Sequence, residues 1–585
     1  MTPRGRFRFW VAWLIGGLLA ALFWYGPLLD SFWGSLTGIF IFGFLVSVPL
    51  GWLLTRLSKK LWAQDWQKAK IAVTLLAVAA VFFYSVFLIR KHDNLFTGYD
   101  LAIFDQAIWH MSRLEIPQST IRDVPWIFGD HFHPIITFLA PIYAIFPDAR
   151  TLLAAQSLLL VLGVVVIYLW ARRANMLPLW AVILCFIYLT HPGIQGAANS
   201  EFHEIAFAPV LILAVFYNMR QRNWRSFFLF ALLLLLVKEE FALWVAAIGI
   251  YLLIKEKQKR AALATIAGAV VYFVMAVAVV MPKLNYEGIG YAYGSLYPGF
   301  EGGFAQGITH YLSNPGDAVR LVLQNPEKWW TIGFYLLFLA PFLLFAIVDM
   351  ILFIPALALR VFTSYKYLSY AGLYYNVVFT PLAMAVFFHF ADRVGNNSLL
   401  QKLAKLFDHI RVDLMAWAIA FLLAVNFFYT FGYSYLLDPV HNWNAISRPY
   451  GKETIELLAQ IPSDAAVSAS SSLLPHLSQR DRIYVLPKIA DAEYVIFEYC
   501  QDICGYWPVI GAENMHQVQN FLADNPLYEK KFENQAGIVF KRVGDIDEGQ
   551  GKELADFCQK IINQGELEPI HHQYFLRSCQ VVKSR

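Results

Sequence analysis

Long apolar runs separated by short polar segments make up the first three quarters of the chain. A helix needs about 20 apolar residues to cross the hydrocarbon core of a bilayer. The pattern therefore predicts a polytopic α-helical membrane protein with about thirteen transmembrane helices. The expected spans are 9–28, 36–56, 70–89, 150–170, 177–190, 205–219, 226–238, 240–254, 261–281, 329–347, 349–361, 372–391 and 414–433.

Clusters of Lys and Arg between the spans predict the orientation, because cytoplasmic loops carry an excess of these residues. With thirteen spans, every basic cluster falls on one side, which we assign to the cytoplasm together with the N-terminus. The chain is then expected in the cell (inner) membrane, with 90–149, 191–204, 282–328 and everything after 434 outside. The clusters are Arg4–Arg8, Arg56–Lys60, Arg172–Arg173, Arg220–Arg225, Lys255–Arg260 and Lys402–Arg411.

Three parts are expected along the chain. Residues 1–69 form an N-terminal extension of two spans, and 70–433 form the main transmembrane domain with a large first outer loop at 90–149. Within that loop, 134–146 is apolar but too short to cross, so it is expected to re-enter the membrane or lie flat on it. Two short spans meet at Lys238-Glu239-Glu240, which predicts a helical hairpin with a polar tip.

Residues 434–585 contain more charged residues and no run long enough to span. Helix-like stretches alternate there with short β-type runs, which predicts an extracytoplasmic α/β domain. The helix-like stretches are Glu453–Gln460 and Val518–Ala523, and the β-type runs are Ala466–Ala469, Ile483–Leu486, Tyr494–Phe497 and Gly537–Lys541. Four of the five cysteines lie in this part, and an oxidising compartment would permit the disulfides Cys500–Cys504 and Cys558–Cys579.

Composition supports the membrane assignment and narrows the function. The 585 residues are 58% hydrophobic and only 15% charged, with a mean hydropathy of +0.50. The formal net charge of +4 is not gathered into a basic stripe with stacking aromatics, so nucleic acid is not an expected partner. No phosphate-binding Gly-rich loop, dinucleotide fingerprint or nucleophile elbow occurs, which disfavours a pump driven by ATP bound to this chain.

Ionisable groups cluster on the predicted outer side, where their desolvation needs a partner or a function. Asp100 and Asp105 follow the turn-like Thr97-Gly98-Tyr99. Asp100 is a candidate either for the N-cap of a helix or for a general base. Five residues on a helix correspond to about 140° of rotation, so the two acids do not share one face and do not make a good metal-binding pair.

Three further polar groups lie on the same side: His131 and His133, then Glu201, His203 and Glu204, then Lys238, Glu239 and Glu240. All are candidate substrate-binding residues. A divalent metal is possible but not required, with His131, His133, His203 and Glu204 as candidate ligands. Capping and ion pairing are competing interpretations for the acids. Lys366, between two late spans, is a candidate partner for a phosphate.

Several of these motifs together resemble an uncharacterised prokaryotic family of predicted membrane proteins. The similarity extends from about residue 70 to about residue 500. The motifs that carry it are Gly98–Trp109 (GYDLAIFDQAIW), Gly129–Pro134 (GDHFHP), Ala140–Tyr143 (APIY), Glu201–Glu204 (EFHE), Lys238–Glu240 (KEE) and Pro475–Ser478 (PHLS) with Arg480.

That family is similar to the GT-C class of glycosyltransferases, which take a sugar from a polyprenyl-phosphate donor and pass it to an extracytoplasmic acceptor. The resemblance implies a GT-C-like fold and an integral-membrane glycosyltransferase with membrane lipid, donor and acceptor as partners. It also implies that Asp100 is the general base, with Asp105 as the second choice. The two acids do not form the closely spaced acidic doublet of some class members, which leaves metal dependence open.

A transporter or flippase for a lipid or polar solute is the main alternative, because the same polar clusters could line a pathway. Inverted repeats would favour transport, and the sequence has no convincing internal symmetry. A structural or assembly factor is a third possibility, and it predicts that replacing Asp100 leaves activity unchanged.

Overall fold

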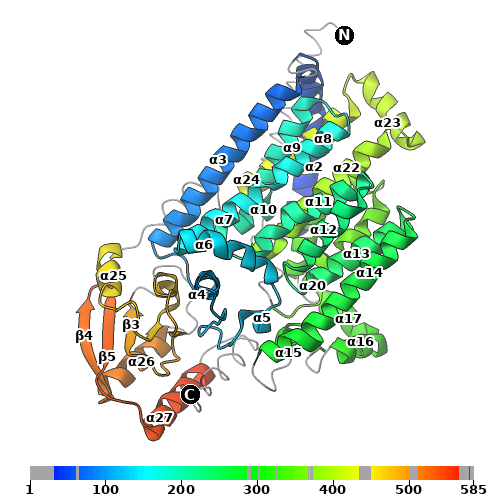
Figure 1. Ribbon diagram of the computed structural model, residues 1–585. Coiled ribbons are helices and arrows are strands. Elements are labelled where there is room, and N and C mark those ends of the chain that lie inside the picture. The colour runs from blue at the N-terminus through cyan, green and yellow to red at the C-terminus, as the bar shows by residue number, and fades with distance from the viewer. Residues whose placement is uncertain are drawn as a thin grey trace.

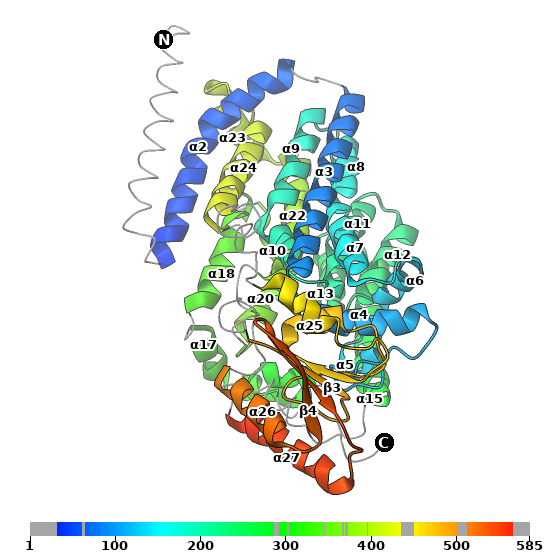
Figure 2. The same ribbon diagram turned by 90° about the vertical axis from the view of Figure 1, so that its left-hand side faces the viewer.

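A computed structural model describes residues 32–60, 65–285, 292–300, 304–323, 326–343, 345–365, 368, 373–394, 396–433, 450–499, 512–564 and 579. The apolar runs form a helical bundle, and a mixed sheet lies at the end of the bundle opposite α23 (Ser398–His409) (Figures 1 and 2). The main bundle helices are α2 (Phe32–Lys60), α3 (Trp66–Asp93), α7 (Ala149–Val161), α8 (Gly163–Arg173), α9 (Pro178–Thr190), α10 (Pro192–Asn199), α11 (Ala208–Arg220), α12 (Trp224–Leu235), α13 (Phe241–Ile254), α14 (Lys259–Val274), α18 (Pro326–Leu337), α20 (Ile354–Val361), α22 (Phe379–Val394) and α24 (Leu414–Tyr433).

Shorter elements connect the bundle helices. They are η2 (Glu204–Phe207), the π-helical turn η3 (Met275–Val280), α15 (Met281–Leu284), η4 (Ala292–Leu296), α16 (Phe304–Ser313), α17 (Pro315–Leu323), α19 (Ala340–Leu343), η5 (Ile347–Phe353), η6 (Tyr374–Val378) and α23 (Ser398–His409).

Five helical stretches in the described part of the chain are long and apolar enough to cross a membrane, or up to seven if each of two bent pairs is one span. The five are Gly38–Ser58, Trp66–Asp93, Ala149–Arg173, Lys259–Leu284 and Tyr374–Val394. Other predicted spans form helices too short for a full crossing; α12, for example, has 12 residues and α13 has 14. The count of thirteen therefore stays a prediction, and its first span, 9–28, lies outside the described residues.

The first outer loop lies between the bundle and the sheet. It contains α4 (Tyr99–Ser112), α5 (Ile127–Asp130), η1 (Pro134–Leu139) and α6 (Ala140–Ile145) (Figure 1). The predicted short apolar segment corresponds to η1 and α6. Its large apolar side chains include an exposed set spaced for one helix face, which is typical of a helix in the membrane interface. That set is Phe138, Ile142, Ile145 and Phe146.

The C-terminal part forms a five-stranded sheet in the order β2-β1-β3-β5-β4. β1 pairs in parallel with β2 and β3, and β5 pairs antiparallel with β3 and β4. Each of the four predicted β-type runs falls on a strand, whereas β4 was not predicted because its charged residues are typical of an edge strand. The elements are α25 (Gly451–Leu458), β1 (Val467–Ala469), η8 (Ser471–His476), β2 (Ile483–Val485), β3 (Tyr494–Glu498), α26 (Ala512–Asp524), β4 (Tyr528–Asn534), β5 (Gly537–Arg542) and α27 (Glu548–Gln564).

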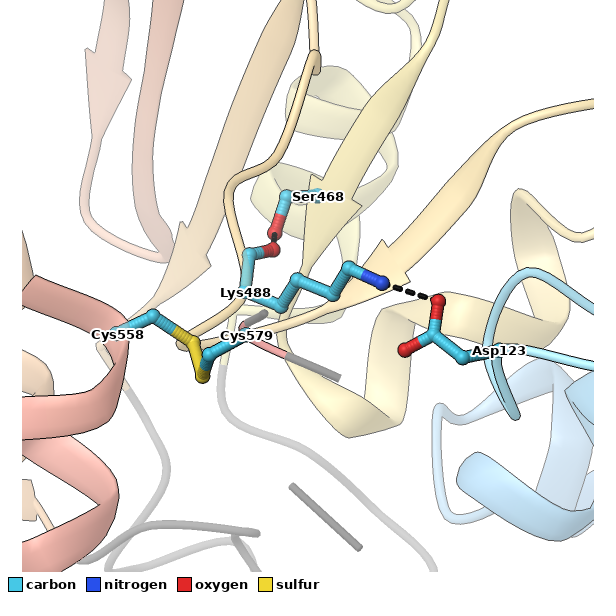
Figure 3. Close-up of a disulfide and its surroundings, with 5 residues drawn as sticks. All are labelled: Asp123, Ser468, Lys488, Cys558 and Cys579. Atoms are coloured by element: carbon cyan, nitrogen blue, oxygen red, sulfur yellow. Dashed lines mark hydrogen bonds and ion pairs between the residues drawn. A yellow bond between two sulfur atoms is a disulfide. The ribbon is translucent and has the colours of Figure 1, made fainter. Parts of the chain in front are cut away.

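The sheet is joined to the first outer loop. The Thr120 hydroxyl donates to the Ile483 carbonyl (2.7 Å) and accepts from the Ile483 amide (2.9 Å). Lys488 pairs with Asp123 across the same contact, and both side chains are largely buried (Figure 3). The predicted disulfide between Cys558 and Cys579 is present, while Cys500 and Cys504 lie outside the described residues.

Candidate functional site

The site begins at the N-terminus of α4. Its N-cap residue is Gly98, which has no side chain to bond the first amides of the helix. The Glu201 carboxylate takes that role: its Oε1 accepts from the Gly98 amide and its Oε2 from the Leu101 amide, both at 2.8 Å. The interpretation of Asp100 as an N-cap is therefore wrong, because Asp100 lies in the first turn. Glu201 caps α4, about 100 residues away in sequence, rather than the helix that follows it.

Asp100 contacts His203 instead. His203 Nε2 lies 3.2 Å from Asp100 Oδ2, and its Nδ1 lies 2.9 Å from the Glu201 carbonyl oxygen. Both partners only accept hydrogen bonds, so the contacts favour an imidazolium that donates from both nitrogens. Burial disfavours this charge, but the hydrogen bond and charge of Asp100 outweigh it and raise the pKa of His203.

The two members of this pair differ in exposure. The His203 side chain is buried and stacks on the Tyr374 ring with centroids 3.5 Å apart, whereas the Asp100 side chain is 48% exposed. The His203 ring, which contacts Tyr374 and the Glu201 carbonyl, thus orients a carboxylate that solvent or a substrate can reach. That combination is what a general base requires, since it must come within hydrogen-bond distance of the proton it removes.

The next residue of the motif joins the α12–α13 hairpin. Glu204 Oε1 lies 3.1 Å from Lys238 Nζ, and both side chains are largely buried. Burial opposes the charge of the carboxylate, but Lys238 and the neighbouring histidines outweigh it and lower the pKa of Glu204 to about 2. This ion pair fixes the predicted polar tip of the hairpin against the segment that contacts Asp100.

The hairpin tip also holds the histidine loop. Glu239 is fully buried, and its carboxylate accepts from His131 Nδ1 at 2.8 Å and from the Phe132 amide at 2.9 Å. Burial raises the pKa of Glu239, but His131 outweighs burial and the pKa falls to about 2. The His131 ring in turn stacks on Tyr293, with centroids 3.8 Å apart.

An arginine–aspartate pair borders this loop. Arg122 binds Asp130 through two contacts, Nε to Oδ2 at 3.0 Å and Nη2 to Oδ1 at 2.7 Å. The Tyr293 hydroxyl accepts from Arg122 and donates to Asp130. Burial raises the pKa of Asp130, but the adjacent Arg122 guanidinium outweighs it and lowers that pKa to about 2.

His133 differs from the other histidines of the cluster. It is buried between the rings of Phe104 and Phe128, and neither of its ring nitrogens has a hydrogen-bond partner among the described residues. Burial lowers its pKa to about 4, which keeps the ring neutral. The Phe104 ring also contacts His203 (6.0 Å between centroids), so His133 and the Asp100–His203 pair belong to one cluster.

Among the described residues, the structure brings most of the predicted site residues together and separates Asp105 from them. Asp105 is fully buried in another network, against the C-terminal part of the chain. Glu240, the N-cap residue of α13, is partly buried and lies within electrostatic range of Lys238 and Arg360. Lys366 lies outside the described residues. Tyr293 and Tyr374 were not predicted, because they join the cluster by stacking on histidines from distant segments, and Tyr293 also by hydrogen bonds to Arg122 and Asp130.

The four candidate metal ligands do not form a common site. His131, His203 and Glu204 each bond to another protein group, and His133 packs between aromatic rings. Within the described ranges, one group of three ligand-type side chains has all its ligand atoms within 4.8 Å of one another. It consists of His110, Glu115 and Asp481, outside the Asp100 cluster.

Comparisons with known proteins give one family and a distant structural likeness. A family model described as "Predicted membrane protein (DUF2079)" matches residues 91–510, more than half of the chain. A search of curated proteins finds no match. Among solved structures, the crystal structure of ArnT from Cupriavidus metallidurans in the apo state is similar at 12% identity and a TM-score of 0.43, covering 79% of this chain and 97% of that one.

Proposed function

The chain belongs to the DUF2079 family of predicted membrane proteins, and we propose that it is an integral-membrane glycosyltransferase. It would move a sugar from a polyprenyl-phosphate donor to an acceptor outside the cytoplasm. The observation that carries the proposal is the Asp100–His203 pair: a half-exposed carboxylate oriented by a buried imidazolium, at the end of the helical bundle. The buried His203 ring is costly to hold beside a charged partner, which favours a function for this pair.

In the proposed reaction Asp100 is the general base. It accepts the proton of an acceptor hydroxyl while that oxygen attacks the anomeric carbon of the donor sugar. The bond between the anomeric carbon and the phosphate oxygen breaks, and the polyprenyl phosphate leaves with the electron pair. His203 and Glu201 are positioning residues, because one bonds the base and the other caps the helix that carries it.

His133 is the proposed hydrogen-bonding residue for the substrate. Its neutral ring has an acceptor and a donor that no described residue satisfies, and burying such groups without a partner costs about 1–3 kcal/mol each. A sugar hydroxyl can satisfy both kinds of group. Lys238 and His131, which are paired with Glu204 and Glu239, are further proposed substrate-binding residues. Glu240 and Lys366 complete the proposed substrate-binding set; from the sequence, Lys366 is the candidate partner of the leaving phosphate.

We also propose the orientation expected from the basic loops, with the N-terminus in the cytoplasm and the sheet outside. The C-terminal end of α2, which includes Arg56–Lys60, and the helix α23 lie at the end of the bundle away from the sheet (Figures 1 and 2). These segments belong to two of the predicted cytoplasmic clusters. The Cys558–Cys579 disulfide lies in the sheet part, and disulfides persist mainly in oxidising compartments. We also propose the division of the chain into an N-terminal extension (1–69), a main transmembrane domain (70–433) and an extracytoplasmic α/β domain (434–585).

A transporter or flippase remains the second candidate because of one further cluster. Asp349 is fully buried and contacts His389 Nδ1 (2.6 Å), the Tyr251 hydroxyl (3.0 Å) and Arg393 Nη2 (3.0 Å). Ionisable groups buried inside a membrane bundle often mark ion or proton pathways.

Purified protein in lipid nanodiscs, incubated with a panel of polyprenyl-phosphate sugars and acceptors, tests the proposal. We expect turnover by the wild type and a loss of about 10²–10⁴-fold in Asp100→Asn, because the amide accepts no proton. Glu115→Gln is the matched control: it neutralises an exposed acid just after α4, outside the cluster, and should leave turnover unchanged. Unchanged turnover in Asp100→Asn would contradict the role of Asp100 as the general base. Passage of lipid or solute across liposomes without sugar transfer would favour transport.

A further inference from the structure

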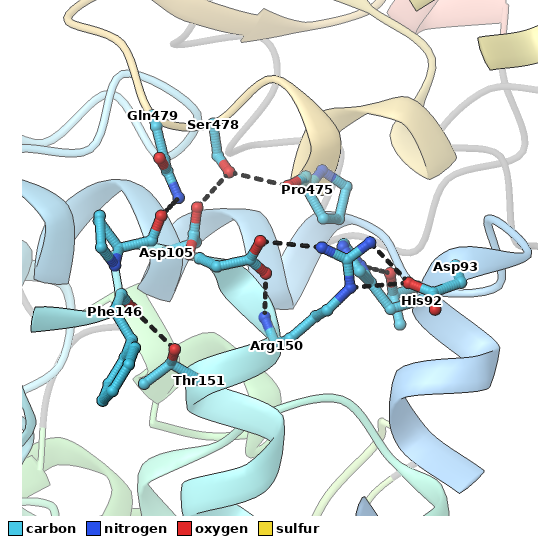
Figure 4. A network of polar contacts seen from close by, with 12 residues as sticks. His92, Asp93, Asp105, Phe146, Arg150, Thr151, Pro475, Ser478 and Gln479 are labelled. Atoms are coloured by element: carbon cyan, nitrogen blue, oxygen red, sulfur yellow. Dashed lines mark hydrogen bonds and ion pairs between the residues drawn. The ribbon is translucent and has the colours of Figure 1, made fainter. Parts of the chain in front are cut away.

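Asp105 lies in a buried network that joins α4 to the C-terminal part of the chain. Its carboxylate accepts from the Tyr143 hydroxyl of α6. It also accepts, at 2.6 Å, from the Ser478 hydroxyl (Figure 4). Gln479 Nε2 donates to the Tyr143 hydroxyl at 2.8 Å and to the Pro147 carbonyl at 3.0 Å. We call Asp105, Tyr143, Ser478 and Gln479 the latch. It joins segments more than 330 residues apart in sequence.

The latch can remain bonded whether or not Asp105 carries a proton. Ser478 has one hydroxyl hydrogen, and its oxygen lies 2.6 Å from Asp105 Oδ2 and 3.2 Å from the Pro475 carbonyl. With an ionised Asp105, the hydroxyl donates to the carboxylate. With a protonated Asp105, the acid donates to Ser478, which then donates to Pro475. The geometry therefore requires a polar group that bonds Ser478 and Tyr143, not a negative charge.

The residues that follow Asp105 and Gln479 in these two segments extend the same contact. Gln106 Nε2 donates to the Arg480 carbonyl and to the Thr120 hydroxyl, both at 3.0 Å. Thr120 is the residue that bonds Ile483 at the start of β2. The contact therefore continues from α4 through the following loop to the edge of the sheet, and its side chains are buried.

Asp105 and Asp100 share one short helix. A rise of 1.5 Å per residue places them about 7.5 Å apart along its axis, on faces about 140° apart. Glu201 holds the first turn of α4, and the latch holds its middle from the other side. A shift or rotation of α4 would move the Asp100 carboxylate, and a misplacement of about 1 Å at a reacting group can lower a rate by about 10²-fold.

We propose that the C-terminal segment 475–480 sets the position of α4, and with it the carboxylate of Asp100, through the latch. Asp105 is then a positioning residue and not a second base. This inference rests on the proposed function only for its effect on turnover; the effect on α4 itself is independent of the reaction.

Three variants test the latch. Asp105→Ala removes both acceptors, and Ser478→Ala removes one bond with a smaller change. Asp105→Asn keeps the contacts, because the amide can donate to Ser478 and its oxygen can accept from Tyr143. We expect kcat to fall about 10–100-fold in Asp105→Ala and less in Ser478→Ala, with the donor KM unchanged. Asp105→Asn should retain most of the wild-type kcat.

Hydrogen–deuterium exchange of amides 99–108 provides the readout that does not need activity. We expect faster exchange in Asp105→Ala and Ser478→Ala, and wild-type exchange in Asp105→Asn. Unchanged exchange in both alanine variants would overturn the latch even if no sugar donor is ever found. An Asp105→Asn variant as inactive as Asp105→Ala, with normal exchange, would instead make Asp105 a base and overturn the positioning role. A wild type without turnover would refute the proposed function alone.

Discussion

At the scale of single residues, the surroundings of the acids decide their chemistry. Asp100 is half-exposed and bonds an imidazolium, whereas Asp105 is fully buried among neutral donors. Burial is the main reason that the pKa of Asp105 rises to about 7, and the hydrogen bonds from Ser478 and Tyr143 offset only part of it. Asp130 is also largely buried, but its pKa falls to about 2 because Arg122 outweighs burial. The partner, more than the degree of burial, sets the charge.

The raised pKa of Asp105 predicts a pH dependence of stability. An unfolded Asp titrates near 4, so between about pH 4 and 7 the folded protein binds one proton more than the unfolded chain. The contribution of Asp105 to stability therefore falls as pH rises through this window and levels off above about 7. Asp105→Asn removes the dependence, and we expect the difference from wild type to change by about 1–3 kcal/mol.

Apparent unfolding temperatures of the wild type and Asp105→Asn in nanodiscs, compared at pH 5, 6, 7 and 8, measure this effect. The charged group that acts on Asp105 is Asp148, the N-cap residue of α7, which pairs with Arg150 of α7. Figure 4 shows Arg150 beside this network. Asp148 and Arg150 are present in both proteins, so their contributions cancel in the comparison. Parallel pH curves for the two proteins would contradict a raised pKa of Asp105.

At the scale of elements, α4 is held in place by hydrogen bonds from two distant segments, one at Glu201 and one at Ser478. Its own N-cap residue, Gly98, contributes no side chain, and Glu201 supplies both acceptors for the first turn. The α12–α13 hairpin is fixed in the same way, through Lys238 to Glu204 and through Glu239 to His131. Each element in the cluster is thus held by a polar partner from another element.

Removing the cap should loosen the start of α4. Glu201→Ala leaves the Gly98 and Leu101 amides without acceptors, and we expect a loss of about 0.5–2 kcal/mol in stability, as for other lost caps. Amides 98–102 should exchange faster with deuterium, while Glu201→Gln, which keeps one carbonyl oxygen, should show a smaller change. Equal exchange in all three proteins would show that Glu201 does not hold the helix.

At the scale of the whole molecule, the two ends of the bundle differ, because only one of them contacts the sheet and its disulfide in the described part of the chain. The helix α4, which includes Asp100, lies near the sheet at one end of the bundle (Figures 1 and 2), and the sheet contacts the loop that follows α4. A disulfide closes the end of the sheet part, linking α27 to Cys579. These features agree with the orientation proposed above, in which the sheet lies outside the cytoplasm.

Loss of that disulfide should destabilise the sheet part and test its compartment. The bond closes a loop with a sequence separation of 21, for which chain entropy predicts a contribution of about 3 kcal/mol. We expect Cys558→Ser with Cys579→Ser to lower the unfolding temperature. In intact cells that express a variant without Cys500 and Cys504, a membrane-impermeant maleimide should label Cys558 and Cys579 only after reduction of the disulfide. Labelling only in broken cells would place the sheet in the cytoplasm.

Much of the fold followed from local patterns. Alternating and continuous apolar runs located four of the five strands and a helix at each predicted span that the structure describes, because hydrophobic periodicity is a local property. The edge strand β4 was not predicted, because most of its side chains are charged and face solvent, so it has no apolar pattern. Helix length could not be predicted as well, and several expected spans are shorter helices.

The sequence by itself determined that this is a helical membrane protein with a C-terminal sheet, and that acids and histidines cluster on one side of it. Only the tertiary structure decided which of these residues meet. Glu201 meets α4 from 100 residues away, His131 meets Glu239 from 108, and Asp105 meets Ser478 from 373. A hydrogen bond or ion pair depends on distances of about 3 Å in the folded chain, and nothing in the local pattern of residues encodes such distances.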